Sequence, residues 1–244
     1  MIYKFQIIYP SDSEDCNKIV ERFRHDSDVM KNMGINIGTT PDENATDLIY
    51  IGFNIDSPAN YPEDPRYLNT FTEYNNYTLM SIYYPLIEDL SIETFFVLDL
   101  NESVINEINK RGWNKVFIKK ESSALEHFEE GKSIWPDTSF EEMKILYGKM
   151  GIEGKYAIRK YIEMDIIDQE ERYWVLKGNI YHRHNNIPYV VKEAAKRLNK
   201  LGSSYYTIDS TPELVIEVNP GESSDRHAVN SAELFASWIK KEFG

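Results

Sequence analysis

Short apolar runs alternate along the chain with longer segments in which apolar residues recur every three or four positions. The short runs predict strands, and the periodic segments predict helices. Strands are expected at residues 2–10, 47–55, 94–100, 114–122, 155–167, 205–209 and 214–219. Helices are expected at residues 11–25, 101–112, 141–151, 188–202 and 231–243.

The second half of the chain carries the pattern of antiparallel strands. Residues 170–184 predict a β-hairpin with Lys177, Gly178 and Asn179 at its turn. Together with the two strands nearest the carboxyl end, this hairpin favours an α+β fold over a uniform parallel sheet. Tyrosine is frequent from Tyr61 to Tyr84, and packing in a core or on a helix is favoured there over a ligand platform.

Composition narrows the classes of partner. The 244 residues carry 27 Lys and Arg against 40 Asp and Glu, a formal net charge of −13, and no basic run is present. We therefore expect neither nucleic acid nor an anionic membrane as a partner. The single cysteine, Cys16, excludes an intramolecular disulfide framework and makes the cytoplasm the expected location. No segment has the apolar length of a membrane helix.

Three oxygen-bearing side chains occur on the strands "YYTID" and "LVIEVN". In the second strand, Leu214, Ile216 and Val218 are expected on one face, with Val215, Glu217 and Asn219 on the other. The apolar pattern favours a register in which Ile208 lies opposite Ile216, and Asp209 and Glu217 become diagonal neighbours.

Asp209, Glu217 and Asn219 would then share one face of the sheet. Carboxylate and amide oxygens suit Mg²⁺, which also binds phosphates and water. A solvated hairpin face is the alternative that this pattern alone leaves open.

Residues upstream add an ordered set of chemical groups. Lys119 ends the strand "VFIK", Glu163 follows the strand "RKYIE", and Arg172 lies in "EERYWV". In this order, followed by Asp209 and "IEVNPG", the chain resembles the ATP-grasp superfamily over about residues 93–244. The resemblance implies a two-lobed ATP-grasp fold that holds ATP between two α+β subdomains and joins a carboxylate to an amine through an acyl-phosphate.

The resemblance implies roles for individual residues. Lys119 is similar to the lysine that contacts the ATP phosphates, and Arg172 to an arginine near phosphates or substrate. Tyr161 and Ile162 would offer backbone groups to adenine, and Glu163 would bind the ribose. Asp209, Glu217 and Asn219 match the magnesium ligands. The implied division is a small α/β domain at 1–90 and an ATP-grasp domain at 91–244, with a hinge near 159–165.

The chain also departs from the family pattern. A glycine-rich loop usually follows the phosphate lysine, whereas "KESSALEHFEEGKS" contains only Gly131. Lys120 stands where a proline is frequent, and because Lys119 and Lys120 alternate faces, one of the two is expected in solvent. Without the resemblance, Arg172 would be assigned to a surface pair with Glu170 or Asp168.

Histidines remain as secondary candidates. His182 and His184 are two apart on one strand, so a transition metal is conceivable, but a solvated or substrate-facing role is favoured because no third ligand stands out. His227 follows the strand that contains Glu217 and Asn219, and it is a candidate either for contact with an acidic substrate or for capping the last helix. A cation such as Arg172 or Arg183 is a candidate to stabilise a tetrahedral oxyanion.

The sequence therefore predicts an ATP- and Mg²⁺-dependent ligase that joins a carboxylate to an amine of a small molecule, amino acid or peptide. A kinase that leaves the phosphate on its substrate is one alternative. A catalytically silent nucleotide-binding or interaction protein is another, motivated by the missing glycine-rich loop. The oligomeric state is left open.

Overall fold

The computed structural model describes residues 5–11, 15, 17–51, 64–68, 70–122, 131–163, 169–224 and 230–244. Within these ranges the chain forms three β-sheets with helices packed against them. The strands are β1 (Phe5–Ile8), β2 (Asn36–Gly38), β3 (Asp47–Tyr50), β4 (Thr94–Val97), β5 (Val116–Lys120), β6 (Ile134–Trp135), β7 (Tyr156–Lys160), β8 (Glu171–Leu176), β9 (Asn179–Tyr181), β10 (Tyr205–Ser210) and β11 (Val215–Pro220).

The helices occur between these strands and at the carboxyl end. The α-helices are α1 (Glu21–Asn32), α2 (Phe71–Thr78), α3 (Met80–Ile87), α4 (Glu102–Lys110), α5 (Phe140–Lys149), α7 (Tyr189–Leu198) and α8 (Ala232–Phe243). The short 3₁₀ helices are η2 (Glu88–Leu90), η4 (Asn199–Leu201) and η5 (Gly221–Ser223). Among the described residues, none of the helices has the length and apolar content needed to cross a membrane.

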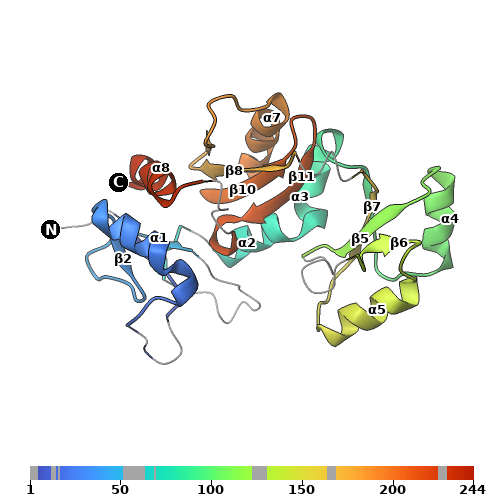
Figure 1. Ribbon diagram of the computed structural model, residues 1–244, viewed down its shortest axis with the longest axis horizontal. Coiled ribbons are helices and arrows are strands. Elements are labelled where there is room, and N and C mark those ends of the chain that lie inside the picture. Colours follow the sequence, from blue (N-terminus) through green and yellow to red (C-terminus); the bar gives the residue numbers. More distant parts are fainter. Residues whose placement is uncertain are drawn as a thin grey trace.

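The N-terminal sheet is parallel, with strand order β2-β1-β3. Phe5 and Ile7 of β1 share a buried core with Phe23 of α1 and with Phe235 and Trp238 of α8. The first and last described elements, β1 and α8, therefore lie side by side at one end of the elongated molecule (Figure 1).

The middle sheet is antiparallel, with strand order β11-β10-β8-β9. Helices α2, α3 and α7 cover one of its faces, where Tyr77, Tyr83 and Val191 pack against Tyr206 and Ile208. The opposite face carries Trp174 of β8 and Tyr205 of β10, which join the core shared by β1 and α8. Further along the same strands this second face carries the polar residues of the candidate site.

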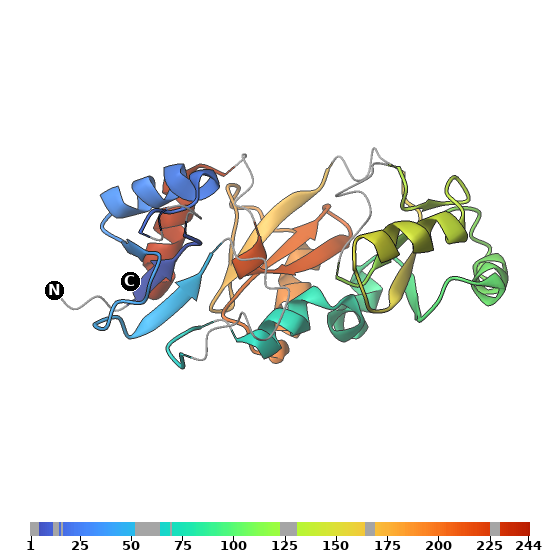
Figure 2. The ribbon, with the colours of Figure 1, turned by 90° about the horizontal axis from the view of Figure 1, so that it is seen from below.

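The third sheet is also antiparallel, with strand order β4-β7-β5-β6. Helices α4 and α5 pack on it through a core that includes Ile108, Ile118 and Tyr147. Figure 2 shows this lobe at the end of the molecule away from the termini, with the middle sheet between the two ends. The mixture of one parallel and two antiparallel sheets confirms the predicted α+β class.

Most predicted elements are confirmed, and local signals explain their ends. Asn101 caps α4 by accepting a hydrogen bond from the Ser103 backbone N–H at 3.0 Å, and Gly112, with φ of 68°, ends it. The predicted hairpin is formed by β8 and β9, and Lys177 and Gly178 have φ of 47° and 82° in its turn. The tyrosines of α2 and α3 that are buried, such as Tyr77, confirm the packing role predicted for that cluster.

Two element predictions were wrong. The helix expected at residues 11–25 begins only at Glu21, and residues 17–20 before it are not helical. The strand expected at 155–167 ends at Lys160, and residues 161–163 have neither helical nor strand structure. The strands β2 and β6 and the helices α2 and α3 were not predicted, since each is short or lacks clear periodicity.

Candidate functional site

A row of charged side chains crosses three neighbouring strands of the middle sheet. In the observed register Arg172 of β8 lies opposite Asp209 of β10, and Asp209 lies opposite Glu217 of β11. Asn219 follows on β11 two residues later, on the same face. The three strands thus place one cation, two carboxylates and one amide side by side.

Hydrogen bonds confirm that these side chains converge. Arg172 donates from Nε to Asp209 Oδ1 at 2.7 Å and from Nη2 to Asp209 Oδ2 at 2.6 Å. Asn219 Nδ2 donates to Asp209 Oδ2 at 3.2 Å and to Glu217 Oε2 at 3.3 Å. The Asp209 side chain is 3% exposed, so the ion pair that Arg172 forms with it is buried rather than on the surface. The bidentate geometry is the strong form of this interaction.

The third sheet contributes the lysine. Lys119 of β5 extends from that lobe and donates a hydrogen bond to the Glu217 carboxylate. This contact joins residues 98 positions apart in the sequence. All five residues predicted to hold phosphates or magnesium therefore lie together where the third sheet meets the middle sheet: Lys119, Arg172, Asp209, Glu217 and Asn219.

The predicted register between β10 and β11 was wrong in detail. Ile208 lies opposite Val218 rather than Ile216, so Asp209 and Glu217 are direct partners and not diagonal ones. A shift of two residues keeps Asp209, Glu217 and Asn219 on one face, which is why the site still forms.

A β-bulge also corrects the predicted faces of β11. Asp209 pairs with Glu217 but Ser210 pairs with Val215, so Ile216 is an additional residue in the strand. The extra residue reverses the alternation before it, and Val215 packs in the core with Val218 instead of lying beside Glu217. The bulge therefore buries Val215 and leaves Glu217 facing the site.

The charges of the site change the protonation of its acids. Burial raises the pKa of Glu217, but the Lys119 ammonium and its hydrogen bond outweigh burial and lower that pKa to about 2. Burial lowers the pKa of Arg172, yet the hydrogen bonds to Asp209 raise it overall. Glu217 and Arg172 are therefore charged at neutral pH.

Two further residues of this region were not assigned to the site from the sequence. Burial, together with repulsion from Asp209 and Glu217, raises the pKa of Glu170 to about 7. Arg159 of β7 is 5% exposed, and its Nη2 donates to the Ile216 carbonyl at 2.7 Å. Burial lowers the pKa of Arg159. The only sequence signal for Arg159 was its charge on an otherwise apolar strand.

The residues predicted to hold adenine and ribose follow β7 directly. The Tyr161 backbone N–H donates to the Lys115 carbonyl at 3.3 Å, and the Lys115 ammonium lies 4.5 Å from the Tyr161 ring centroid. Glu163 is exposed. Residues 164–168, which come next, lie outside the described residues, so the roles of Tyr161, Ile162 and Glu163 stay predictions.

Lys120 corrects the expectation that one of the two neighbouring lysines is in solvent. Both are buried, and Lys120 Nζ donates to the Gly154 carbonyl at 2.7 Å and lies 3.6 Å from the Tyr156 ring centroid. Lys120 therefore stabilises its own lobe.

His182 and His184 lie near the Glu171 carboxylate. His182 Nε2 is 3.4 Å and His184 Nε2 is 3.9 Å from that carboxylate, and Arg183 donates to it at 2.7 Å. Burial lowers the pKa of His182. Within the described ranges, no group of three or more His, Cys, Asp and Glu side chains is arranged to hold a metal ion. His227 lies outside the described residues.

The donor chemistry of the central cluster nevertheless fits magnesium. Asp209 and Glu217 supply carboxylate oxygens and Asn219 supplies an amide oxygen, which are ligands that Mg²⁺ accepts alongside phosphates and water. In the ligand-free chain, Lys119 and Arg172 neutralise the same two carboxylates. A bound Mg²⁺ would neutralise these same carboxylates.

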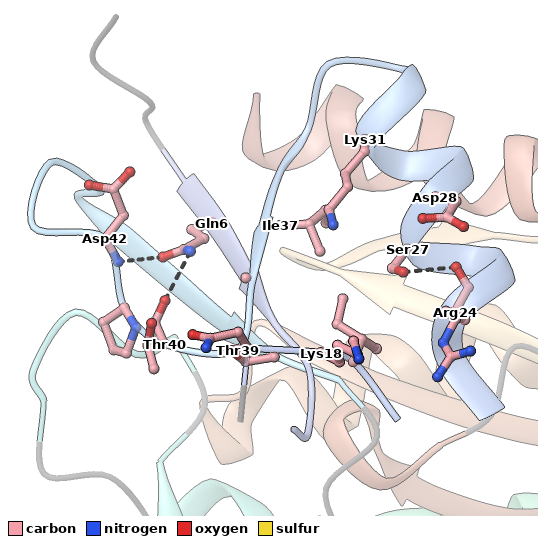
Figure 3. Close-up of a pocket in the computed structure, with 14 residues that line it drawn as sticks. Gln6, Lys18, Arg24, Ser27, Asp28, Lys31, Ile37, Thr39, Thr40 and Asp42 are labelled. Carbon is pink, nitrogen blue, oxygen red and sulfur yellow. Dashed lines mark hydrogen bonds between the residues drawn. The ribbon is translucent and has the colours of Figure 1, made fainter. Parts of the chain in front are cut away.

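A surface cavity of about 720 Å³ lies elsewhere, in the N-terminal part of the chain (Figure 3). It lies between α1 and the segment after β2, and Gln6 holds that segment through Thr40 and Asp42. Its bases Lys18 and Arg24 already pair with Asp15 and Glu21. None of the predicted site residues lines it, so this cavity and the charged cluster are separate features.

Comparison with known proteins identifies the fold. No family model and no curated protein matches the chain. The ATP-grasp ligase PsnB, solved with a minimal precursor, is similar at a TM-score of 0.61 and 10% identity, with 100% of each chain covered. A RiPP-associated ATP-grasp ligase from Chryseobacterium gregarium, solved with ADP and a leader and core peptide, is similar at 0.61 and 11%, covering 98% of this chain and 96% of that one.

A RimK domain ATP-grasp protein from Sphaerobacter thermophilus is similar at a TM-score of 0.58 and 12% identity, covering 96% of this chain and 99% of that one. Likeness at such low identity defines the fold and not the activity. The chain has the ATP-grasp fold, as the order of its motifs predicted, and the likeness extends over almost its whole length rather than over residues 93–244 alone.

Proposed function

We propose that this protein is an ATP- and Mg²⁺-dependent ligase that joins a carboxylate to an amine through an acyl-phosphate. The observation that carries the proposal is the convergence of Lys119, Arg172, Asp209, Glu217 and Asn219 from two lobes onto one place. ATP would lie between these lobes, next to the predicted hinge at residues 159–165. The proposed domains are 1–90 and 91–244.

The residues present suit phosphoryl transfer from ATP. Asp209, Glu217 and Asn219 would hold Mg²⁺, which when bound neutralises the charge of the phosphates. Lys119 would leave Glu217 to contact the phosphates, and Arg172 would stabilise the charge on the transferred group and then the oxyanion of the tetrahedral intermediate.

The bonds of the proposed reaction balance without a nucleophile from the protein. The substrate carboxylate oxygen attacks the γ-phosphorus and ADP leaves. The amine nitrogen then attacks the acyl carbon, phosphate leaves, and the nitrogen loses a proton to form the amide. Cys16 is therefore not needed, and this ATP-consuming reaction suits the cytoplasmic location expected from the sequence.

A peptide is the proposed substrate class. The support comes from PsnB, solved with its precursor, and from the Chryseobacterium gregarium ligase, solved with leader and core peptides. Tyr161, Ile162 and Glu163 are proposed to bind adenine and ribose, as predicted from the sequence.

The first experiment measures Mg²⁺-dependent binding of a non-hydrolysable ATP analogue by calorimetry. The variant carrying both Glu217→Gln and Asn219→Ala should lose binding by about a hundredfold, because two of three metal ligands are gone. Glu213→Gln, an exposed carboxylate on the turn between β10 and β11, is the matched control and should bind like the wild type. Absence of nucleotide binding by the wild type would refute every enzymatic reading.

A second experiment separates the ligase from its alternatives. The protein is incubated with ATP and a panel of amino acids and acidic peptides, and products are analysed by mass spectrometry. A new amide with loss of water supports the ligase, whereas a stable phosphorylated product identifies a kinase. Nucleotide binding without any product supports the silent binding protein.

A further inference from the structure

Arg159 is a buried cation that the proposed reaction does not use. It belongs to β7, in the lobe that carries Lys119, and it is 5% exposed. Its Nη2 donates to the Ile216 carbonyl at 2.7 Å, while its Nε is buried without a hydrogen-bond partner in the described part of the chain. Buried charged groups with an unsatisfied donor are rare in native proteins, so the position calls for an explanation.

The contact of Arg159 is made at the β-bulge of β11. Ile216 is the additional residue of that bulge and has no partner residue on β10. Bulges commonly redirect a side chain next to an active site. Here the bulge determines that Val215 faces the core while Glu217 faces the carboxylate cluster.

Arg159 and Lys119 act on the same short stretch of β11. Lys119 pairs with Ala157 across β5 and β7, and Arg159 is two residues beyond Ala157, so both cations project from one face of the sheet. Lys119 contacts the Glu217 side chain, and Arg159 contacts the main chain one residue earlier. The two contacts therefore hold the side chain and the backbone of one acid separately.

We propose that Arg159 is a positioning residue that fixes the Ile216–Glu217 peptide, so that the Glu217 carboxylate keeps facing the metal site after Lys119 has moved to the phosphates. The inference rests on the proposed function, because only the loss of Lys119 to a nucleotide leaves Glu217 in need of a second restraint. Residues that orient a metal ligand typically change metal affinity when they are replaced.

Ser91 provides a matched control at the same bulge. Its hydroxyl donates to the Val215 carbonyl at 2.8 Å, so it also anchors the main chain of β11, one residue before Ile216. It carries no charge and contacts a residue that faces the core. If Arg159 were a purely structural anchor of β11, Ser91→Ala and Arg159→Met would therefore change Mg²⁺ affinity to the same extent.

The test measures Mg²⁺ affinity by calorimetry at a saturating concentration of a non-hydrolysable ATP analogue. Arg159→Met should weaken Mg²⁺ binding by about tenfold to a hundredfold, Arg159→Lys should recover part of it, and Ser91→Ala should leave it unchanged. An unchanged Mg²⁺ affinity in Arg159→Met, or an equal loss in Ser91→Ala, overturns the proposal. If Arg159→Met does not fold, Arg159→Lys against Ser91→Ala decides.

Hydrogen exchange keeps this inference separate from the proposed function. In the ligand-free protein, Arg159→Met should speed exchange at the amides of residues 216–218, while those of β8 keep their wild-type protection. Equal exchange in wild type and variant overturns the positioning role. A wild type that binds no nucleotide refutes the proposed function instead, and the exchange result alone then decides whether Arg159 positions Glu217.

Discussion

At the scale of single residues, the candidate site is a set of carboxylates compensated by cations. Asp209 is matched by Arg172, and Glu217 by Lys119. Glu170 lacks such a partner among the described contacts and experiences repulsion from both of the other acids. Partial burial and this repulsion outweigh the attraction of Arg172 and Arg159, so Glu170 is the acid of the site that takes up a proton most readily.

The raised pKa of Glu170 predicts a pH dependence of stability. The pKa rises from its ordinary value of 4.5 to about 7, so the folded state binds a proton that the unfolded state has released. The resulting stabilisation is complete below about pH 4.5 and is lost as the pH rises through 7. Replacing Glu170 by Gln should remove this dependence, which amounts to about 3 kcal/mol at most.

Urea unfolding of wild type and Glu170→Gln at about pH 5 and about pH 8 checks the prediction. Relative to the variant, the wild type should lose stability on going to the higher pH. Glu153 is an exposed carboxylate of the lobe that contains the third sheet. The stability of Glu153→Gln should therefore change with pH as that of the wild type does. If the stability of Glu170→Gln changes with pH as much as that of the wild type, Glu170 is ionised in the folded protein at both pH values.

The sequence predicted the convergence of five residues because their order along the chain is itself informative. Lys119, Arg172 and Asp209 are each weak signals, but the ATP-grasp resemblance ties them to one place. Arg159 could not be found in this way, since an arginine on a strand is equally consistent with a solvent-facing position. Its role depends on the Ile216 carbonyl, 57 residues away in the sequence, which no local pattern shows.

At the scale of elements, the pairing of β10 with β11 shows what side-chain alternation can and cannot predict. Parity placed Asp209 and Glu217 on one face, and a two-residue shift preserved that result. The bulge at Ile216 was not predictable, because Leu214, Val215 and Ile216 are all apolar and nothing in the sequence marks one of them as the extra residue. Val215 was therefore assigned to the wrong face.

Helix boundaries show a similar limit. The acids of the stretch before α1 suggested a first turn, yet α1 begins at Glu21 and Val20 provides no side-chain cap. Helix α2, in contrast, has a capping box formed by Thr70 and Glu73, which the sequence contains but which was hidden within the tyrosine-rich segment. Caps are therefore informative only when the apolar pattern around them is clear.

The turn after β11 gives a prediction for an element that supports the site. Gly221 follows Pro220 and begins η5, and a Cβ at Gly221 would overlap the buried ring of Tyr205. Gly221→Ala should therefore destabilise the protein by about 1–3 kcal/mol through overpacking. Gly148→Ala in α5, where nothing lies within 4 Å of the added Cβ, should instead stabilise it by about 0.5–1 kcal/mol.

Thermal and urea unfolding of the two variants measure this difference directly. The sign should be opposite for the two alanines, because only one of them meets a neighbouring ring. Equal stability of Gly221→Ala and wild type would mean that the Tyr205 ring moves aside without cost, and the close approach of β10 to the turn would then not constrain β11.

At the scale of the whole molecule, the chain is built around separate apolar cores. One core joins β1 and α1 to α8 and to Trp174 of the middle sheet. Another lies in the third lobe between its sheet and the helices α4 and α5, and includes Ile108 and Ile118. The third sheet meets the middle sheet through polar contacts such as that between Lys119 and Glu217, and through Ala157 of β7, which belongs to the core of the middle sheet. Such an arrangement favours regional unfolding over a single transition.

The separation of the cores predicts which regions lose stability together. Phe235 of α8 is 2% exposed and its ring centroid lies 4.7 Å from that of Trp174. Phe235→Ala should destabilise its core by about 3–5 kcal/mol and lower hydrogen-exchange protection in β1 and β8, although these strands are far from α8 in the sequence. Protection in β5 and β7 should stay at the wild-type level.

Ile108→Ala tests the reciprocal case in the third lobe, where Ile108 is fully buried. It should lower protection in β5 and β7 by a similar free energy, about 2–5 kcal/mol, and leave β1 unchanged. Uniform loss of protection along the whole chain in either variant would contradict the separation, because it would show that the lobes unfold as one unit. If each variant loses protection only in its own core, the third lobe keeps its fold when the N-terminal core is weakened. Its polar contacts to β11 would then break and form again without unfolding of the lobe.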